Sequence, residues 1–209
     1  SANVDKIAWH ENDGSEGFTE HAISTSTDGA RSVYAVDVDG DGDMDVLSAS
    51  QLDNKIAWYE NDGSENFTEH AISTSANGAM SVHAADVDGD GDMDVLSGSY
   101  HNDKIAWYEN DGSENFTEHA ISTSADGAYS VFTADVDGDG DMDVLSASYL
   151  GSKIAWYDND GSETFTEYVI STSAYGALSI HAADVDADGD MDVLSASIND
   201  DKIAWYEND

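Results

Sequence analysis

An acidic nine-residue segment occurs four times in this sequence and carries its clearest chemical signal. The first copy reads Asp-Val-Asp-Gly-Asp-Gly-Asp-Met-Asp at residues 37–45. Carboxylates at positions 1, 3, 5 and 9, a turn glycine at position 6 and a backbone carbonyl at position 7 would form an oxygen-only cage. Hard cations require such donors, and Ca²⁺ tolerates their irregular geometry better than Mg²⁺ does. We therefore predict Ca²⁺ as the cofactor, at about four sites.

The candidate metal-ligating residues are the five aspartates of each copy. An acidic turn that only solvates the end of a hairpin is the alternative, but four copies with the same spacing make it the weaker interpretation. An EF-hand is excluded because position 12 is serine in every copy and the flanking segments read as strands. The fourth copy has alanine in place of the glycine at position 4. The candidates are Asp37, Asp39, Asp41, Asp43, Asp45, Asp86, Asp88, Asp90, Asp92, Asp94, Asp135, Asp137, Asp139, Asp141, Asp143, Asp184, Asp186, Asp188, Asp190 and Asp192.

The elements that position these loops belong to a tandem repeat. Tryptophan recurs every 49 residues, and each unit holds four short runs rich in β-branched or aromatic residues, bounded by Gly, Asn, Asp and Ser. These runs predict four strands per unit and no helix. We expect one repeat domain over residues 1–209, with units at about 1–49, 50–98, 99–147 and 148–196 and a partial unit at 197–209.

The predicted fold class is all-β, a β-propeller of four-stranded blades. In the Trp strand, Ile56 and Trp58 occupy one face and Ala57 and Tyr59 the other, so both faces are apolar. Sheets that are covered on both faces at a fixed period favour stacked blades over a two-layer sandwich. The two strands that flank the acidic loop carry small residues, as the narrow inner part of a wedge-shaped blade requires. A β-roll or β-sandwich is the alternative fold.

The order of strand, D-x-D-G-D-G-x-x-D loop, strand, aromatic strand and N-D-G-S turn resembles the FG-GAP/VCBS repeat family, the blades of integrin-α-like propellers. The resemblance covers all four units. It implies that Asp37, Asp39, Asp41 and Asp45 are side-chain ligands and that Asp43 contributes its backbone oxygen, with equivalent roles in the other copies. It also implies an extracellular or cell-surface protein that serves in adhesion, in carbohydrate binding or as a scaffold beside a separate catalytic domain.

Composition excludes several classes of function. The formal net charge is -39, so phosphate backbones and anionic lipid surfaces are repelled, and we expect no nucleic-acid partner. No apolar run is long enough for membrane insertion. The sequence has no cysteine, which excludes disulfides and thiolate metal sites. Near-identical units offer no asymmetric catalytic site, so we expect a binding or display module and not an enzyme.

Three recurring residue types have competing interpretations. The Trp-Tyr pairs suit sugar stacking, but an aromatic at one strand position in every unit is more often packing between blades. Histidines at two strand positions exchange with Tyr or Phe between units, which favours packing over metal ligation. A lysine begins each Trp strand, and its side chain either pairs with a nearby loop aspartate or is solvated.

Two columns of residues differ from unit to unit and are the candidates for ligand contact. One is the loop that precedes each Trp strand, and the other is the column Arg31, Met80, Tyr129 and Leu178. They suit a ligand-facing rim, and neutral drift after duplication is the alternative. We expect a calcium-binding scaffold for an unidentified protein or glycan ligand, with a lectin-type propeller or the non-catalytic part of a larger secreted enzyme as alternatives.

The strand count predicts how the chain ends are used. There are five Trp strands but only four of every other kind. We expect the strand at residues 18–24 to join the last blade and close the ring, which leaves the strand at residues 6–11 without a place. A surplus apolar strand will not stay unpaired in water. The sequence thus predicts a homo-oligomer formed by strand exchange, or an excerpt of a longer propeller.

Overall fold

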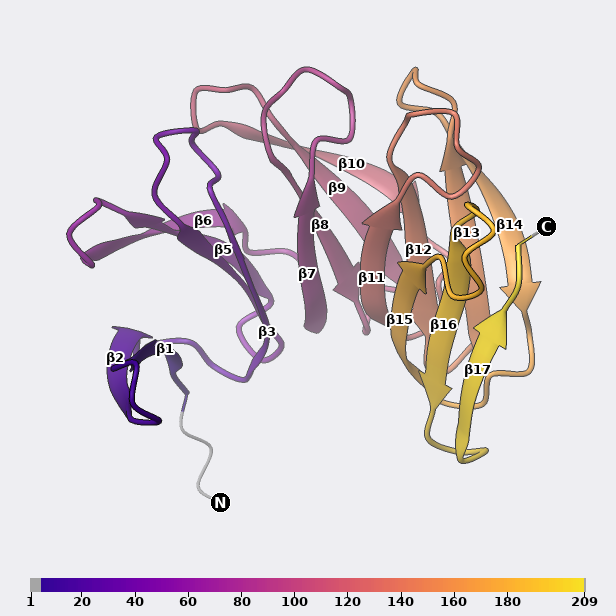
Figure 1. Cartoon of the computed structure of the whole chain (residues 1–209), viewed down its shortest axis with the longest axis horizontal. Helices are drawn as coiled ribbons and strands as arrows, with labels where there is room; N and C mark the ends of the chain where they lie inside the picture. The colour runs from indigo at the N-terminus through magenta and orange to yellow at the C-terminus, as the bar shows by residue number, and fades with distance from the viewer. Residues whose placement is uncertain (1–4, 209) are drawn as a thin grey trace.

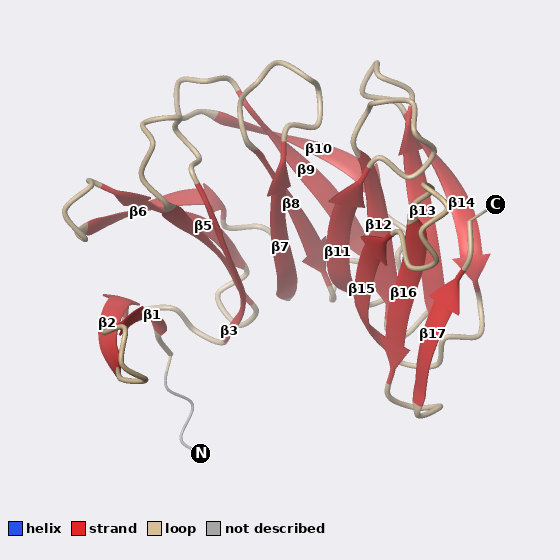
Figure 2. Ribbon diagram, in the orientation of Figure 1, coloured by secondary structure: helices blue, strands red, loops and turns tan. Residues whose placement is uncertain are grey.

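The computed structural model describes residues 5–208, which contain seventeen β-strands and no helix (Figure 2). Every described strand pairing is antiparallel, as expected for short strands joined by tight turns. An all-β fold of short strands was predicted from runs of four to eight residues between turns, and it is confirmed by observed strands of five to seven residues. None of the described residues belongs to a helix that is long and apolar enough to cross a membrane.

Three complete four-stranded sheets, here called blades, form the centre of the molecule. Each blade begins 49 residues after the previous one, at residues 30, 79 and 128. Their strands are β3 (Ala30–Val36), β4 (Asp45–Ser50), β5 (Lys55–Asn61) and β6 (Phe67–Ser73) in the first blade, β7 (Ala79–Ala85), β8 (Asp94–Ser99), β9 (Lys104–Asn110) and β10 (Phe116–Ser122) in the second, and β11 (Ala128–Ala134), β12 (Asp143–Ser148), β13 (Lys153–Asn159) and β14 (Phe165–Ser171) in the third.

Two incomplete sheets flank these blades. The N-terminal hairpin consists of β1 (Ile7–Asn12) and β2 (Phe18–Ser24), and the last blade of β15 (Ala177–Ala183), β16 (Asp192–Ser197) and β17 (Lys202–Tyr206). The sheets stand side by side in an open arc, with the described chain ends at its opposite extremities (Figure 1). This is a propeller-type stack of blades that is not closed into a ring.

The core lies between blades. Ile56 and Trp58 on one face of the first blade belong to the same buried cluster as Ala106 and Tyr108 on the facing side of the second. Trp58 and Tyr59 are each 1% exposed, so both faces of this strand are buried, as the alternation of apolar residues predicts. Burial of apolar surface on two faces stabilises a sheet that could not stand alone in water.

The predicted closure of the ring is wrong. Residues 18–24 pair with β1 instead of joining the last blade, and β17 keeps a free edge. The reason is local, because β1 and β2 are joined by one tight turn in which the Asp13 carboxylate accepts hydrogen bonds from the N–H groups of Ser15 and Gly17. Pairing across that turn has a low entropic cost, whereas the predicted pairing must join two distant segments. The strand at residues 6–11 is therefore paired within its own hairpin.

Candidate metal centres and ligand cavity

The acidic loops connect the two innermost strands of the three complete blades and of the last blade. In the first blade the loop begins directly after β3 and ends at Asp45, the first residue of β4. Positions 4 and 6 have left-handed backbones, with φ of 74° at Gly40 and 96° at Gly42, which glycine adopts at little cost. The fourth copy holds Ala187 at φ 65°, so this loop carries local backbone strain that the other three lack.

Hydrogen bonds within each loop turn the carboxylates inward. In the first copy Asp37 accepts from the N–H groups of Gly40 at 2.8 Å and Gly42 at 3.0 Å. Asp39 accepts from Asp41 N–H at 3.1 Å, and Asp41 accepts from Asp43 N–H at 2.8 Å. The same bonds recur in the other three copies, with Ala187 N–H in place of a glycine N–H in the fourth. The backbone thus holds several negative groups close together.

Each loop contains a group of three carboxylates whose oxygens lie within 4.8 Å of one another. Like charges at this distance repel, and a bound cation relieves the repulsion. The donors are all oxygen atoms, which fits a hard metal ion. Each of the four clusters could therefore hold a metal ion. The groups are Asp37, Asp39 and Asp41; Asp86, Asp88 and Asp90; Asp135, Asp137 and Asp143; and Asp184, Asp186 and Asp192.

The closing aspartate at position 9 is fully buried in all four copies. In the second copy the Asp94 carboxylate accepts from Asn110 N–H at 2.8 Å and from Val87 N–H at 3.0 Å. Burial nevertheless raises the pKa of Asp94 to about 6, because desolvation of the charged form outweighs these bonds. The pKa of Asp192 is instead lowered, chiefly by the Asn208 N–H, at the end of the arc where no further blade covers the loop.

The aspartate at position 7 lies outside every cluster. In the three complete blades its side chain lies against the Asn-Asp-Gly-Ser turn of the same blade, and in the first a Cβ on Gly63 would lie 2.4 Å from an Asp43 carboxylate oxygen. Gly63 therefore leaves room for Asp43 and also takes φ of 73°. The orientation agrees with a role for Asp43 through its backbone oxygen only, which stays a prediction.

The asparagines at or just after the ends of the last three Trp strands connect neighbouring loops, a role that the sequence reasoning missed. Asn110 donates its Nδ2 hydrogens to the Val38 carbonyl of the preceding blade and to the Met93 carbonyl of its own blade, both at 3.2 Å. Asn159 and Asn208 make the equivalent bonds. The recurrence of Asn before Asp-Gly-Ser was the available signal, but it was interpreted only as part of a turn.

The recurring aromatic residues pack within and between blades. Trp58 and Trp107 are each 1% exposed and cannot serve as sugar platforms. The ring of His70 stacks on Trp58 with centroids 4.6 Å apart, and Tyr168 stacks on Trp156 at 4.8 Å. The exchange of histidine with tyrosine is thus explained by packing, as predicted.

The lysines pair with glutamates on the outermost strands. Lys55 Nζ lies 2.5 Å from Glu69 Oε1 and 3.7 Å from Asp53 Oδ2, so the expected loop aspartate is only the secondary partner. Lys6 and Lys104 make the same pairing with glutamate. Lys202 at the open end of the arc pairs with Asp200 at 3.2 Å instead.

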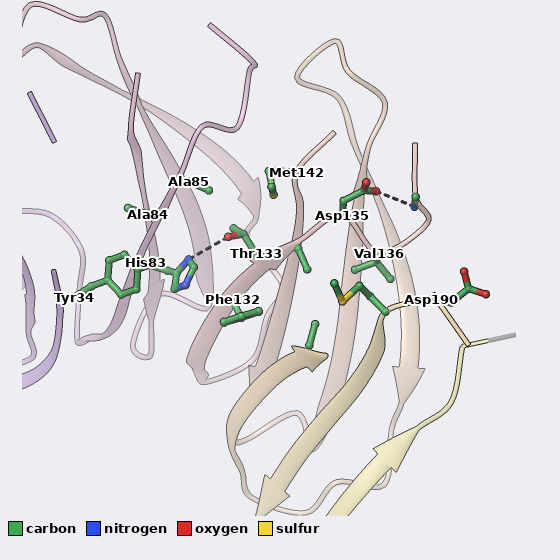
Figure 3. Close-up of a pocket in the computed structure, with 15 residues that line it drawn as sticks. Tyr34, His83, Ala84, Ala85, Phe132, Thr133, Asp135, Val136, Met142 and Asp190 are labelled. Carbon is green, nitrogen blue, oxygen red and sulfur yellow. Dashed lines mark hydrogen bonds between the residues drawn. The ribbon is translucent and has the colours of Figure 1, made fainter. Parts of the chain in front are cut away.

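A cavity of about 680 Å³ opens along the innermost strands at the loop end (Figure 3). Its wall includes the rings of Tyr34, His83 and Phe132, which are tilted against one another with neighbouring centroids 4.5 and 4.9 Å apart. His83 Nδ1 lies 3.1 Å from Thr133 Oγ1. Burial lowers the pKa of His83 to about 4, with a smaller contribution from the charge of His181, so the ring is neutral at pH 7.

A second cavity of about 420 Å³ lies at the other end of the sheets, and the two variable columns meet there. The topology places both columns at this end, since Arg31 is the second residue of β3 and Gln51 directly follows β4. Arg31 Nε donates to Gln51 Oε1 at 2.8 Å. The lining residues are Arg31, Gln51, Met80, Tyr100, Tyr129, Tyr149, Leu178 and Ile198.

Three tyrosines form the aromatic part of this second cavity. The ring centroids of Tyr100, Tyr129 and Tyr149 are 6.0–6.5 Å apart, and all three side chains remain partly exposed. In an otherwise repetitive chain, the cavity is therefore lined by residues that differ between blades. This convergence could not be seen in the sequence, because the two columns are about twenty residues apart in each unit.

Open stacks of four-stranded antiparallel blades with an acidic loop between the inner strands define a propeller-type repeat protein. The family model for the FG-GAP-like repeat matches residues 1–48, 37–97, 86–146 and 135–195. The chain belongs to this FG-GAP-like repeat family, as its motifs predicted. No curated protein is similar enough in sequence to count as a match.

Several solved structures share the fold at low sequence identity. An Agrocybe aegerita lectin that recognises non-reducing terminal N-acetylglucosamine is 16% identical, with a TM-score of 0.61 over 91% of this chain and 55% of the lectin. An auxiliary nutrient binding protein from Bacteroides ovatus is 14% identical, with a TM-score of 0.63 over 98% and 52%. An exo-β-1,3-galactanase from Phanerochaete chrysosporium is 13% identical, with a TM-score of 0.50 over 93% and 47%. The chain spans about half the length of each of these structures.

Proposed function

We propose that this chain is a calcium-stabilised extracellular scaffold that binds a ligand in the cavity between its variable columns. The observation that carries the proposal is the meeting of eight residues, two from each of four repeats, at one cavity of about 420 Å³. A packing role would be served equally well by the same residue in every blade. Differences between repeats that meet on one concave surface of a rigid scaffold favour ligand recognition instead. Recognition of a ligand by such a scaffold supports a role in adhesion.

Calcium is the ion that the donor set favours. The clusters contain only carboxylate oxygens, without sulfur or imidazole, and the loops provide further backbone carbonyls. Similarity to the FG-GAP-like repeat supports the same ion. Isothermal titration with Ca²⁺ and with Mg²⁺ tests this proposal: we expect about four Ca²⁺ per chain and much weaker Mg²⁺ binding. A stoichiometry below two Ca²⁺, or a preference for Mg²⁺, would contradict it.

The same loops support an extracellular location. Extracellular calcium modules have dissociation constants of roughly 10⁻⁴–10⁻³ M, and a loop with one turn of backbone and no bidentate glutamate is suited to that range. Full loading with four Ca²⁺ would change the formal charge from -39 to -31, so self-repulsion remains and favours a saline setting. A dissociation constant near 10⁻⁷ M in the titration would instead favour an intracellular sensor.

A binding role is also proposed in preference to catalysis. Every acidic loop has three counterparts of nearly the same geometry, and no carboxylate of residues 5–208 lines the second cavity. Among the described lining residues the one charged group is that of Arg31, which donates a hydrogen bond to Gln51. A general acid or base would need a titratable group placed alone in such a cavity. The solved structures with this fold include an enzyme and non-enzymes, so the fold leaves both classes open.

A carbohydrate is the second candidate ligand class, favoured by the three clustered tyrosines. Tyrosine offers a ring face for the C–H side of a sugar and a hydroxyl for hydrogen bonding. Arg31 and Gln51 add polar groups on the same cavity wall. The fold shared with a lectin supports this candidate without assigning its sugar to this chain.

A glycan array in the presence and absence of Ca²⁺ separates the two candidates. If the ligand is a carbohydrate, one class of sugar binds in Ca²⁺, and Tyr129→Ala reduces that binding by roughly tenfold or more. Tyr175→Ala is the matched control, because Tyr175 is 56% exposed and lies outside the cavity. Equal effects of the two substitutions would contradict the cavity as the binding site. If no glycan on the array binds, a protein ligand is the favoured class.

A further inference from the structure

The two ends of the arc expose faces that are buried everywhere else. Val33 on β3 is 58% exposed, whereas the equivalent Val82 and Val131 are each 4% exposed under a neighbouring blade. At the other end Ile203 on β17 is 85% exposed, whereas the equivalent Ile56 is fully buried. These faces have the composition of an interior joint between blades, and each lacks the sheet that would cover it.

We propose that two copies of this chain join head to tail into a closed ring of eight blades. In each of two joints, the N-terminal hairpin of one copy supplies the outer half of a blade, and β15 and β16 of the other copy supply the inner half. Each copy has three complete blades, so six complete blades and two shared ones give eight. Eight blades lie within the usual range of four to eight for propellers.

The interior joints specify what must cover the exposed faces. Between the first two blades, Leu47 of β4 packs in one buried cluster with Val82 of β7. The position of Leu47 is taken by Leu194 in the last blade, and the position of Val82 by Val33 in the first. A second copy would therefore place its Leu194 over Val33, and the joint would continue the interior contact with the same residue types.

The hairpin already occupies the outer half of the place that it would have in a shared blade. Ile7 is 3% exposed and clusters with Ala57 and Tyr59 on the outer part of the first blade. The inner part of that same face, at Val33, is the part left open. The missing cover is thus two inner strands beside β1, which are the strands that β15 and β16 would provide.

The acidic loop of the last blade is compatible with this exchange. In complete blades an asparagine of the Trp strand donates its N–H to the closing aspartate, as Asn61 does to Asp45 at 2.8 Å. Asn208, two residues after β17, makes this bond to Asp192 within the single chain. Asn12 of β1 stands at the equivalent position but has no acidic loop in its own hairpin. In the ring, Asn12 of the second copy takes the place of Asn208.

β17 is the strand that is displaced in the ring, because β1 and β17 would occupy the same place in the shared blade. β1 is held by its turn to β2 and by the buried Ile7, and Lys6 pairs with Glu20 at 2.6 Å. β17 has a partner on one edge only, and its Ile203 is exposed. Exchange releases β17, a strand of five residues that is paired on one edge and whose Ile203 is already 85% exposed. The hairpin that replaces it supplies both the third and the fourth strand, so the shared blade gains more pairing than the release of β17 costs.

Light scattering coupled to size-exclusion chromatography in Ca²⁺ tests the assembly. We expect a mass of about twice 22.3 kDa at micromolar concentration. Val33→Lys should weaken the dimer by more than about tenfold, since a lysine in the joint would be buried without a partner. Val169→Lys is the control, because Val169 is 52% exposed on the outer strand of a blade with neighbours on both sides. A monomer at all concentrations would overturn the proposal and favour further blades of a longer protein as the cover.

Engineered disulfides test the arrangement of the strands in a chain without cysteine. Ser48 and Ala57 lie directly opposite each other in a complete blade, and the equivalent pair in the shared blade is Ser195 with Ala8 of the second copy. The doubly substituted Ala8→Cys, Ser195→Cys chain should form an intermolecular disulfide and migrate at twice its mass without reductant. Ser146→Cys with Ala155→Cys, opposite each other in the third blade, is the control that should form an intramolecular disulfide.

Each other outcome overturns the closed dimer. An intramolecular disulfide between residues 8 and 195 would show that one chain closes into a ring of four blades. A ladder of species that grows with concentration would show an open filament. A dimer that forms no disulfide at this pair while the control pair is oxidised would show a different joint.

Discussion

Asp94→Asn separates the two roles that the structure gives to the closing aspartate. Asp94 is fully buried and accepts two backbone hydrogen bonds, so it is part of the fold as well as a candidate ligand. Asparagine keeps the size and one acceptor but places an NH₂ group opposite a backbone N–H. That mismatch costs about 1–3 kcal/mol.

When calcium is absent, removal of the buried Asp94 charge stabilises the folded protein and offsets this cost. Burial raises the pKa of Asp94 to about 6, about two units above its ordinary value of 3.8, so at pH 7 the folded protein holds a carboxylate at a cost of about 3 kcal/mol. Asparagine carries no such cost. We therefore expect the free energy of unfolding in EDTA to change by no more than about 2 kcal/mol.

In calcium the same substitution should be clearly destabilising. One site occupied at a hundredfold excess of Ca²⁺ over its dissociation constant contributes about 2.7 kcal/mol, and this contribution is lost with the site. Urea unfolding in EDTA and in Ca²⁺ measures both free energies, and titration should show three ions in place of four. Asp92→Asn is the control and should retain all four ions, since the Asp92 side chain lies against Gly112, whereas the Asp94 carboxylate is close enough to Asp88 for their charges to interact. Equal losses for Asp94→Asn in EDTA and in calcium would refute the assignment of Asp94 as a ligand.

Three further predictions concern calcium, pH and backbone strain. Excess EDTA should lower the melting temperature by more than about 20 °C, because four sites at the same excess contribute about 11 kcal/mol; a shift of a degree or two would contradict a structural role. His83→Phe should cost about 1 kcal/mol at pH 7.5 through the lost Thr133 bond. At pH 5 the same substitution should be favourable. Because the folded-state pKa of His83 is about 4, the stability that the neutral ring contributes is present above pH 6.5 and falls by about 2 kcal/mol at pH 5. Parallel pH profiles of the free energy of unfolding for the two proteins would refute this. Ala187→Gly should raise the free energy of unfolding by about 1 kcal/mol by relieving φ of 65°, and Gly138→Ala, at φ 77° with no atom within 4 Å of a new Cβ, should lower it by a similar amount; equal signs in urea unfolding would contradict the strain argument.

Most of the individual blade could be predicted from the sequence because its determinants are local. The 49-residue period, the alternation of Ile56 and Trp58 with Ala57 and Tyr59, and the Asn-Asp-Gly-Ser turns specify strands, their faces and their hairpins. The acidic loops are equally local, since nine consecutive residues bring their own carboxylates together. Each loop groups three of the four predicted carboxylates within 4.8 Å, at positions 1, 3 and 5 in the first two copies and at positions 1, 3 and 9 in the last two.

What could not be predicted depends on segments that are distant along the chain. The burial of Asp94, the Asn110 bond to a loop 72 residues earlier and the cavity that joins Tyr129 to Tyr149 arise only when blades stack and curve. A sequence pattern specifies which face of a strand is apolar, but not which other strand covers it.

The ends of the arc make this division plain. The sequence by itself determined that β1 and β17 are Trp strands, because their Lys-Ile-Ala-Trp segments are identical. The same identity makes them equally suited to one place in a blade, so no local rule could decide between them. The tertiary structure decided it: β1 pairs with β2 across a tight turn of low entropic cost, and β17 pairs only with β16 and is left with a free edge.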